Sequence, residues 1–473
     1  MQPAPVRRYA SLLLEFPRLG GRFCAIAFVS LGVLARSLAL GADTGPATAG
    51  AEPQTFNFHL QNTDIVQGDP AFPAKYSGPN SLHKDGEVRE TVSLDLYGGL
   101  RLWRGAEAHV DGLMWQGSGL SNTFGIEDFP NNEAYKVDAP VPDFSFARLF
   151  IRQTIGFGGD QEDVPDGPFT LAGKQDVSRL TLTIGRYNAT DIFDTNAYAG
   201  DGRSQFMNWA LVTNATWDYP SDAIGYTTGF SAELNEPSWT LRYGLFQMPG
   251  VANSWTADDK IFTYPRMSPA GVGQFWKSWG MVAELEWRYQ LGGHPGKIRF
   301  TPWLNSAHMG TYNAALFSPG TNIALTRSYR FKYGFGLNLE QELSDNVGFF
   351  SRVGWNDGRE EAWTYTDINF SASLGFSIKG QSWHRPNDTV GLAAIFSAAS
   401  ADNQRYLEAG GLGILDGDGR LRYRWEKVIE TYYDLQMWRT IHFSLDYQFV
   451  ADPAFNRDRG PVSILGARLH LQY

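Results

Sequence analysis

The stretch Arg468-Leu469-His470-Leu471-Gln472-Tyr473 alternates between polar and apolar side chains. Successive side chains of a β-strand point to opposite faces, so the two leucines and the tyrosine share one face, and the arginine, histidine and glutamine share the other. Strands of outer-membrane β-barrels alternate in this way, with apolar residues toward lipid, polar residues toward the lumen and aromatic residues at the interface. The stretch therefore predicts a closing barrel strand that ends on an interfacial aromatic residue.

The same alternation recurs along most of the chain. In residues 281–291, the apolar face carries Trp287 and the opposite face carries Glu284 and Glu286. Comparable segments are residues 94–102, 147–157, 180–184, 239–245, 329–343, 370–378 and 441–449. Strands of soluble sandwiches usually run about 5–6 residues, whereas segments of about ten or more suit a tilted strand that crosses the hydrocarbon core. The pattern favours a transmembrane barrel over the alternative, a soluble β-protein with one wet face per sheet.

The length of the chain sets the size of the barrel. The roughly 430 residues after position 42 accommodate about 16 strands, with 18 as the alternative, and a barrel of this size encloses water. We therefore predict an all-β fold, a single antiparallel transmembrane β-barrel with long extracellular loops that fold into the lumen. The longer linkers are expected to be these outward loops: Gly117–Phe144, Gly158–Val177, Ala189–Tyr226 and Phe246–Phe275.

Residues 1–42 have the composition of a secretory signal peptide. Four arginines precede the apolar run Phe23–Leu34, which is too short to span a bilayer as a helix, and small residues follow it. A membrane anchor is the alternative, although a further arginine follows the run closely. We expect residues 43–55 to form a flexible leader and residues 56–473 to form the barrel domain. The single cysteine, Cys24, lies in the signal, so the exported chain has no disulfide.

The chain is acidic, with a formal net charge of −10. Removal of the signal, which carries five arginines and one glutamate, makes the charge more negative. An acidic chain argues against nucleic acid as a partner. The mean hydropathy of −0.30 fits a barrel because every second strand residue is polar. No run after the signal reaches 18 apolar residues, so no transmembrane helix is expected.

No familiar catalytic or cofactor motif is present in the sequence. It contains no G-x-S-x-G elbow, P-loop, G-x-G-x-x-G or H-E-x-x-H, and its eight histidines show no pair at metal-ligand spacing. Asp416-Gly417-Asp418-Gly419 begins like a calcium-binding loop, but Arg420 and Lys427 occupy positions that require oxygen ligands, so a tight turn is expected. We therefore expect no cofactor, no metal site and no enzymatic activity.

Paired carboxylates could serve as the acid and base of a glycosidase. The pairs Glu284/Glu286 and Glu340/Glu342, however, each lie on one face of an alternating strand, among arginine and lysine residues. That setting favours residues that line a lumen, or a solvated face of a sheet, over catalytic residues.

Short segments spread along the chain form a further pattern. They are Phe72–Leu82, Ala147–Thr154, Asp191–Asn196, Gln205–Leu211, Gly354–Gly358, Trp383–Asp388, Tyr406–Gly411, Gly417–Gly419 and Glu430–Tyr433. In this order, they resemble the OprB-type carbohydrate porins of Gram-negative outer membranes, and the resemblance extends from about Phe56 to Tyr473. The resemblance implies a 16-stranded barrel in the outer membrane, with a charged, aromatic-flanked constriction through which neutral sugars diffuse. It assigns no sugar-binding residue.

A sugar presents hydroxyl groups and apolar C–H faces to a pore. Arginine offers a rigid fork of donors, carboxylates accept from adjacent hydroxyls, and aromatic rings cover the C–H face. The candidate lumen residues of these types are Arg148, Arg152, Arg186, Arg288, Arg330, Lys332, Glu284, Glu286, Glu340, Trp115, Trp209 and Tyr187. For each charged residue the alternative is a generic solvated position, and for each ring it is packing in a girdle or a loop.

The sequence thus predicts passive, carbohydrate-preferring diffusion of small sugars across the outer membrane. One alternative is a general or organic-acid porin of the same fold, and another is an exported β-rich enzyme that acts on polysaccharide. The expected partners are small neutral sugars and outer-membrane lipid. By analogy with other porins the chain forms a homotrimer, and a monomer is the alternative.

Overall fold

The computed structural model describes residues 53–134, 139–252 and 276–473. The predicted signal peptide (1–42) and most of the predicted leader (43–55) lie outside these residues. In the described part of the chain, every helix is too short or too polar to cross a membrane. The described residues belong to one compact unit, Glu52–Tyr473.

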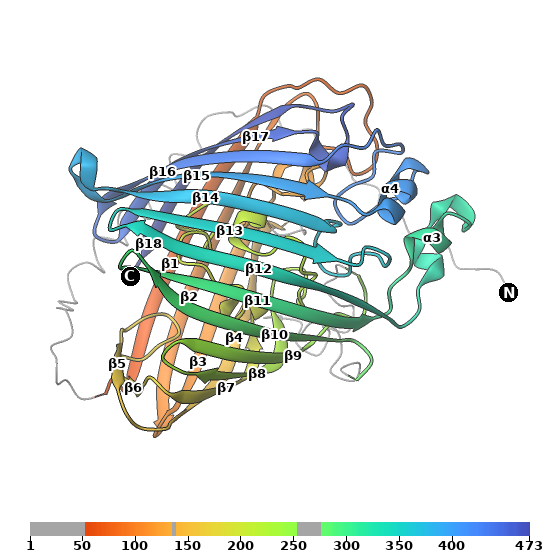
Figure 1. Ribbon diagram of the computed structural model, residues 1–473. Helices are drawn as coiled ribbons and strands as arrows, with labels where there is room; N and C mark the ends of the chain where they lie inside the picture. Colours follow the sequence, from red (N-terminus) through yellow and green to blue (C-terminus); the bar gives the residue numbers. More distant parts are fainter. Residues whose placement is uncertain (1–52, 135–138, 253–275) are drawn as a thin grey trace. The chain divides into compact units, whose positions relative to one another are not determined.

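Sixteen strands of the described residues form one closed antiparallel barrel (Figure 1). They are β1 (Phe56–Asp69), β2 (Glu87–Trp103), β3 (Ala106–Gly117), β4 (Ala139–Gly156), β7 (Arg179–Tyr187), β8 (Thr227–Asn235), β9 (Trp239–Gln247), β10 (Trp279–Leu291), β11 (His294–Ala307), β12 (Arg330–Ser344), β13 (Val347–Asn356), β14 (Phe370–Gly380), β15 (Arg385–Ala398), β16 (Glu426–Trp438), β17 (Ile441–Ala451) and β18 (Val462–Gln472). Each strand pairs with the next barrel strand along the chain, and β1 pairs with β18 with Thr63 opposite His470. The predicted closing strand and the predicted count of about 16 are confirmed.

Each barrel strand has one face toward the outside and one toward the lumen. On β10, Leu285 and Trp287 are 49% and 55% exposed, whereas Glu284 and Glu286 are almost fully buried. The same division holds on β12 and β17, as the alternation predicts. The exposed leucine, phenylalanine and tryptophan side chains form the apolar outer surface that contact with lipid requires.

Connections of very different length join the strands at the two ends of the barrel. Two-residue turns join β2 to β3, β10 to β11, β12 to β13 and β16 to β17. Between β10 and β11 the turn is Gly292-Gly293, and both glycines have the positive φ (61° and 88°) that a tight hairpin turn requires. Long loops occupy the other end, together with α3 (Tyr312–Ala315) and α4 (Ala401–Glu408) (Figure 1). Because porin turns are short on the periplasmic side, the long-loop end is the extracellular one.

One predicted outward loop lies at the turn end instead. The segment 157–178 connects the turn-side ends of β4 and β7 and forms a separate hairpin of β5 (Gln161–Val164) and β6 (Gly173–Asp176), which Figure 1 shows at the end opposite α3 and α4. The prediction that Gly158–Val177 is extracellular is therefore wrong, because the number of strands that precede a loop, and not its length, determines the end of the barrel at which the loop lies. The other three predicted loops, Gly117–Phe144, Ala189–Tyr226 and Phe246–Phe275, leave the barrel at the long-loop end, although residues 253–275 are outside the described part.

The loop between β7 and β8, residues 188–226, fills much of the lumen. Its Phe193, Phe206 and Trp217 are almost fully buried and join the main apolar cluster with inward residues of many strands. Its short helices are η2 (Ala189–Asp191) and α2 (Trp209–Val212), and other connections carry η1 (Leu120–Thr123), η5 (Pro319–Thr321), η6 (Ile323–Thr326), η7 (Gln381–Trp383) and η8 (Pro453–Phe455). We call residues 188–226 the inserted loop. The lumen is therefore narrowed by a packed segment of the same chain.

Candidate functional site

Carboxylates of the barrel wall hold the inserted loop by its backbone. Glu284 on β10 accepts a hydrogen bond from the Asp194 amide (2.7 Å), and Glu340 on β12 accepts one from the Ala197 amide (2.8 Å). Glu430 on β16 accepts two further amides of the loop, at 2.6 and 3.1 Å. Buried amides need such acceptors because water does not reach them. These lumen-facing acids therefore position the loop inside the barrel.

Two wall arginines fasten the same loop through its carbonyls. Arg352 on β13 pairs with Asp194 (3.1 Å) and donates to the carbonyls of Ala199 (2.7 Å) and Leu211 (2.6 Å). Arg468 on β18 donates to two more carbonyls of the loop, both at 2.8 Å. Arginine suits this role because one guanidinium presents several donors in a fixed plane. The polar face of the closing strand thus contributes to the attachment of the loop.

Other wall charges neutralise one another in a network that runs from β9 to β12. Arg242 contacts Glu284 (2.7 Å) and Glu286 (3.2 Å), and Arg299 contacts Glu286 (2.9 Å) and Glu340 (3.2 Å). The three glutamates and Arg299 are nearly inaccessible to solvent, and Arg242 is 11% exposed, so unpaired charges would be costly at these positions. The network supports the acids that hold the inserted loop.

The inserted loop leaves a cavity of about 420 Å³ against the wall formed by β1, β2 and β4. We call it the central cavity. Its lining combines ionic side chains with aromatic rings, among them Glu133, Arg148, Asp191, Arg203, Trp209 and Tyr226. A cavity of this kind offers both donor groups and flat apolar faces to a solute.

Arg148 on β4 lies between two carboxylates at the wall of the central cavity. Its Nη1 donates to Asp111 (2.7 Å), and its Nε and Nη2 donate to the two oxygens of Asp191 (2.8 and 2.7 Å). The rings of Phe169 and Tyr226 lie 4.6 and 5.0 Å from the guanidinium carbon, which fixes its plane further. Arginine has five N–H groups. Three of those of Arg148 donate to these acids, and the other two donate to neither acid.

Arg203, from the inserted loop, forms a second cluster in the same cavity. Its Nη1 donates to Asp95 (2.6 Å), and its Nε donates to Glu133 (2.9 Å) of the β3–β4 loop. The Tyr97 hydroxyl lies near the same guanidinium and donates to Gln61 (2.7 Å). Arg203 therefore ties the inserted loop, the barrel wall and a second extracellular loop to one another.

Aromatic rings are stacked along one side of the central cavity. Trp209 lies between Phe129 (5.1 Å between ring centroids) and Tyr365 (5.4 Å), with interplanar angles of 18° and 19°. Tyr365 in turn stacks on Tyr219 at 4.4 Å. All four rings line the cavity. Burial raises the pKa of Tyr219 to about 12, so its hydroxyl stays neutral and can both donate and accept.

A segment from the turn end closes the cavity on another side. Asn57 on β1 donates to Asp166 (2.8 Å) and to the carbonyls of Gly167 (2.8 Å) and Thr170 (3.0 Å), which folds the tip of segment 157–178 into the barrel. Phe169 of this tip packs edge-on against Tyr97, with ring centroids 5.1 Å apart, and lines the cavity beside Arg148. Both extracellular and turn-side segments therefore contribute to the constriction.

Of the twelve predicted lumen residues, Arg148 and Trp209 line the central cavity. Glu284, Glu286, Glu340 and Arg288 belong to the wall network that supports the inserted loop. As contacts of a solute, all twelve stay predictions.

Three of the remaining predicted cations lie close to acids or carbonyls. Arg186 pairs with Asp222 (2.5 Å) of the inserted loop, and Lys332 lies 3.5 Å from Asp218 of the same loop. Arg152 donates to a carbonyl of segment 157–178 (2.7 Å). These side chains position the segments that narrow the lumen.

The other three predicted residues pack at the edges of the site. Trp115 is buried on β3 and donates to the Glu133 carbonyl (3.0 Å). Tyr187 is buried between Phe150 and Phe246, both edge-on at 5.9 and 5.5 Å. Arg330 is half-buried at the start of β12.

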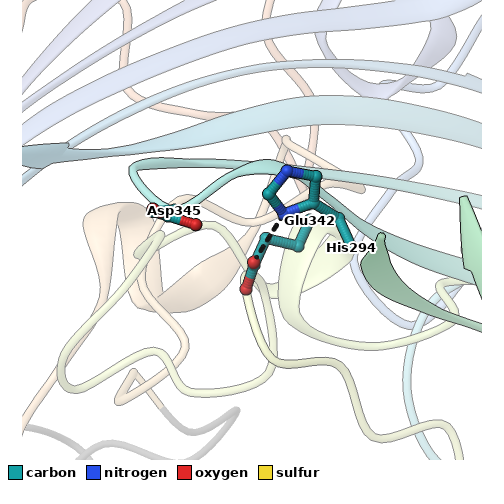
Figure 2. Close-up of side chains that lie close together, drawn as sticks. All are labelled: His294, Glu342 and Asp345. Atoms are coloured by element: carbon teal, nitrogen blue, oxygen red, sulfur yellow. Dashed lines mark hydrogen bonds and ion pairs between the residues drawn. The ribbon is translucent and has the colours of Figure 1, made fainter. Parts of the chain in front are cut away.

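A second, larger cavity of about 650 Å³ opens at the turn end. Glu342 and Asp345 are in its lining, and His294 of β11 pairs with Glu342 at 3.0 Å. Figure 2 shows the three side chains close together near the β12–β13 turn. The His294 and Glu342 side chains are each 31% exposed, so water solvates this group. It forms part of the polar periplasmic mouth.

Comparisons with known proteins identify relatives of this chain. The model of the family described as "Carbohydrate-selective porin, OprB family" matches residues 79–473. Porin AaxA of Chlamydia abortus is 24% identical over 293 residues, which is 61% of this chain and 53% of that protein, and Porin AaxA of Chlamydia caviae is 23% identical over 295 residues (61% and 52%). The chain thus spans about half the length of these relatives. The structure of OprB from Pseudomonas putida at high pH has the same fold, with a TM-score of 0.66, 15% identity, and coverage of 89% of this chain and 94% of that one.

Proposed function

Because the chain belongs to the OprB family of carbohydrate-selective porins, we propose that small neutral sugars diffuse passively through its barrel across the outer membrane. Family members are porins, which are channels rather than enzymes, so the exported polysaccharide-active enzyme is set aside as an alternative. The outer membrane is the location that both the family and the closed barrel with its apolar outer surface indicate.

The observation that supports sugar passage is that Arg148 and the ring stack line the same cavity. Asp111 and Asp191 hold the guanidinium in one orientation and leave two N–H groups for adjacent hydroxyls of a sugar. Trp209 and its stacked neighbours offer a flat apolar face to the C–H side of the same solute. Each contact is weak by itself, as passage requires, because a tight site would block flow.

The charges of the central cavity favour a neutral solute over an organic acid. The cavity lining carries two guanidinium groups, of Arg148 and Arg203, and three carboxylates, of Glu133, Asp191 and Asp201. Two further carboxylates, of Asp111 and Asp95, pair with the same guanidinium groups from behind the lining. The excess of negative charge repels anions, whereas an uncharged sugar experiences no such barrier. For this reason we place the organic-acid porin second. We propose Arg148 and Trp209, with Asp191, Arg203 and Tyr226, as the residues that contact the solute.

A matched pair of solutes tests the proposal. Proteoliposomes that contain the purified protein are placed in isotonic solutions of a neutral hexose or of the corresponding sugar acid, and their swelling rates are compared. We expect faster swelling in the hexose. Equal rates would favour a general porin, and faster swelling in the acid would favour an organic-acid porin, so either result contradicts the proposal.

A tryptophan substitution locates the path of the sugar. Trp209→Ala removes the central ring of the stack, whereas the control Trp438→Ala removes a ring that is 62% exposed at the end of β16. A stacked aromatic contact contributes roughly 0.5–1.5 kcal/mol, so we expect sugar binding in the pore to weaken about threefold to tenfold in the first variant. Unchanged binding, measured as block of ion current by sugar, would exclude Trp209 from the path.

The assembly state is a separate part of the proposal. Lipid contact follows from the exposed apolar side chains of the outer wall. A homotrimer by analogy with other porins and a monomer both fit such a wall. Light scattering of the detergent-solubilised protein, with the detergent mass subtracted, distinguishes the two.

A further inference from the structure

Three acidic side chains meet in the interior near the extracellular end, outside the central cavity. They are Glu127 of the β3–β4 loop, Asp367 of the β13–β14 loop and Asp416 of the β15–β16 loop. One carboxylate oxygen of each lies within 4.8 Å of the others, and the residues are 0%, 2% and 0% exposed. The fold therefore concentrates three acids from distant parts of the sequence at a point that water does not reach.

Hydrogen bonds fix the orientation of two of these acids. The Asp367 amide donates to Glu127 (2.7 Å), and the Ile414 amide and the Tyr312 hydroxyl donate to the two oxygens of Asp367 (both 2.7 Å). A side chain as small as methyl at Gly413 would lie 2.1 Å from Oδ1 of Asp416 and 2.5 Å from Oδ2 of Asp367. The absence of a side chain at Gly413 thus lets the two carboxylates converge.

Asp416 supplies an independent indication of a ligand. Both of its carboxylate oxygens are buried and accept no hydrogen bond from another side chain or from the backbone of another residue, and one oxygen of Glu127 is also without a donor. Within the described residues, none of the three acids forms an ion pair with lysine, arginine or histidine. A buried carboxylate without a partner is costly, and three together are more so. Such a group calls for positive charge.

We propose that Glu127, Asp367 and Asp416 bind a calcium ion that fastens three extracellular loops to one another. Calcium takes oxygen ligands at about 2.3–2.6 Å, so ligands on opposite sides of the ion are at most about 5 Å apart, which the three oxygens satisfy. Asn403 lies next to them, because its amide donates to the Asp367 carbonyl (3.1 Å), and its own oxygen has no donor. Magnesium is less suited, since it retains several waters.

The proposal revises the expectation of no metal site. The sequence motif that begins at Asp416 fails as a calcium loop because Arg420 follows it. The structure replaces the missing positions with residues from two other loops, Glu127 and Asp367, which no local spacing reveals.

The ion would also act on the central cavity. Phe129 is two residues from Glu127, and Tyr365 is two residues from Asp367, and these two rings enclose Trp209. An ion that holds Glu127 and Asp367 together therefore holds the two outer rings at stacking distance from Trp209. Without it, the repulsion between the two carboxylates is opposed at this point by the hydrogen bond from the Asp367 amide to Glu127.

Proton sharing is the competing explanation for the three acids. Burial raises the pKa of Glu127 and of Asp416 well above the usual range, so both carboxyls could remain protonated without a metal. The two explanations differ in their response to calcium. A protonated cluster takes up no ion, whereas a calcium site binds one ion per chain and becomes stronger as pH rises, since the ion competes with protons.

Calcium uptake by the folded full-length protein tests the proposal. The protein is refolded into detergent without lipopolysaccharide, which itself binds calcium, and uptake is measured by equilibrium dialysis. We expect one ion per chain in the wild type and binding at least about tenfold weaker in Asp416→Asn and Glu127→Gln. Glu408→Gln, which removes an exposed acid of α4 from the same loop as Asp416, should bind as the wild type does.

Two measurements on the wild type need no variant. Terbium, which replaces calcium at oxygen sites, should emit on tyrosine excitation because the Tyr312 hydroxyl contacts Asp367, and calcium should suppress the emission. The temperature at which the folded band disappears in a gel should rise with calcium and fall with chelator. Absence of uptake or emission in folded wild-type protein, or equal uptake by the wild type and Asp416→Asn, would overturn the proposal.

Discussion

Replacement of Arg148 by alanine should make the pore markedly more selective for cations. The change removes a positive charge that lies between Asp111 and Asp191 at the wall of the central cavity. A unit charge about 5 Å from a passing ion changes its energy by about 0.8 kcal/mol in water. Screening at physiological salt, with a Debye length of about 8 Å, reduces this to about 0.4 kcal/mol. The entry of a monovalent cation then increases about twofold and that of an anion falls about twofold, so their ratio changes about fourfold.

Reversal potentials across planar bilayers measure this ratio directly. The effect should fall below about twofold at 1 M salt, where the Debye length is about 3 Å. Arg148→Lys keeps the positive charge and loses the planar set of guanidinium donors. The ion selectivity of this variant should therefore resemble that of the wild type, while its sugar binding weakens. Arg405→Ala removes an exposed charge of α4 and serves as the control. An unchanged permeability ratio in Arg148→Ala, or an equal change in Arg148→Lys, would refute the placement of this guanidinium beside the ion path.

Three further perturbations test other parts of the constriction. Phe169→Ala should raise single-channel conductance, because the ring lines the central cavity from the turn side, and an unchanged conductance would show that another segment limits flow. Arg352→Ala leaves the buried Asp194 unpaired, at a cost of about 3–5 kcal/mol. The inserted loop should therefore detach from the barrel wall, and its movement should increase the noise of the single-channel current while the folded barrel keeps its gel mobility. Unchanged current noise would contradict the anchoring role of Arg352. Burial beside Asp357 raises the pKa of Glu360 to about 7 from an ordinary 4.5, so the folded loop binds the proton more tightly than the unfolded chain does. The stability of this loop should therefore be greatest below about pH 4.5 and fall as pH rises through 7. The measurement is proteolysis of residues 357–369, which should increase with pH. A similar pH dependence in Glu360→Gln would exclude the Glu360 carboxyl as the origin of the effect.

The barrel wall could be predicted from sequence because its signal is local. Within residues 281–291, the two-residue period separates Trp287 from Glu284 without knowledge of any other strand, and the structure confirms that division. The end at which a loop emerges is not a local property. Residues 158–177 were assigned to the extracellular side because they are long, whereas four preceding strands place them at the turn end.

The sequence predicted two residues of the central cavity, Arg148 on the barrel wall and Trp209 in the inserted loop. Arg148 was found because it shares the polar face of an alternating strand, and Asp111, its partner on β3, was missed because the short run around it is less regular. Arg203 lies in a loop rich in Gly, Asp and Asn, where no period indicates direction. Asp191 was within a segment that carried the family resemblance, which is the one signal that could have drawn attention to it.

The structure divides the polar residues of the lumen into two groups with different roles. Charges on β9 to β13, such as Glu284 and Arg352, are covered by the inserted loop and paired with the loop or with one another, so they act on a solute only through the position of that loop. On the side of β2 to β4 the loop leaves space, and there Arg148 lines the cavity while it pairs with Asp191 of the loop. Polarity toward the lumen is therefore necessary for a residue to contact the solute, but it is not sufficient. The path of one loop decides which part of a uniformly polar wall the solute meets, and a change in that loop can alter selectivity while every strand keeps its sequence.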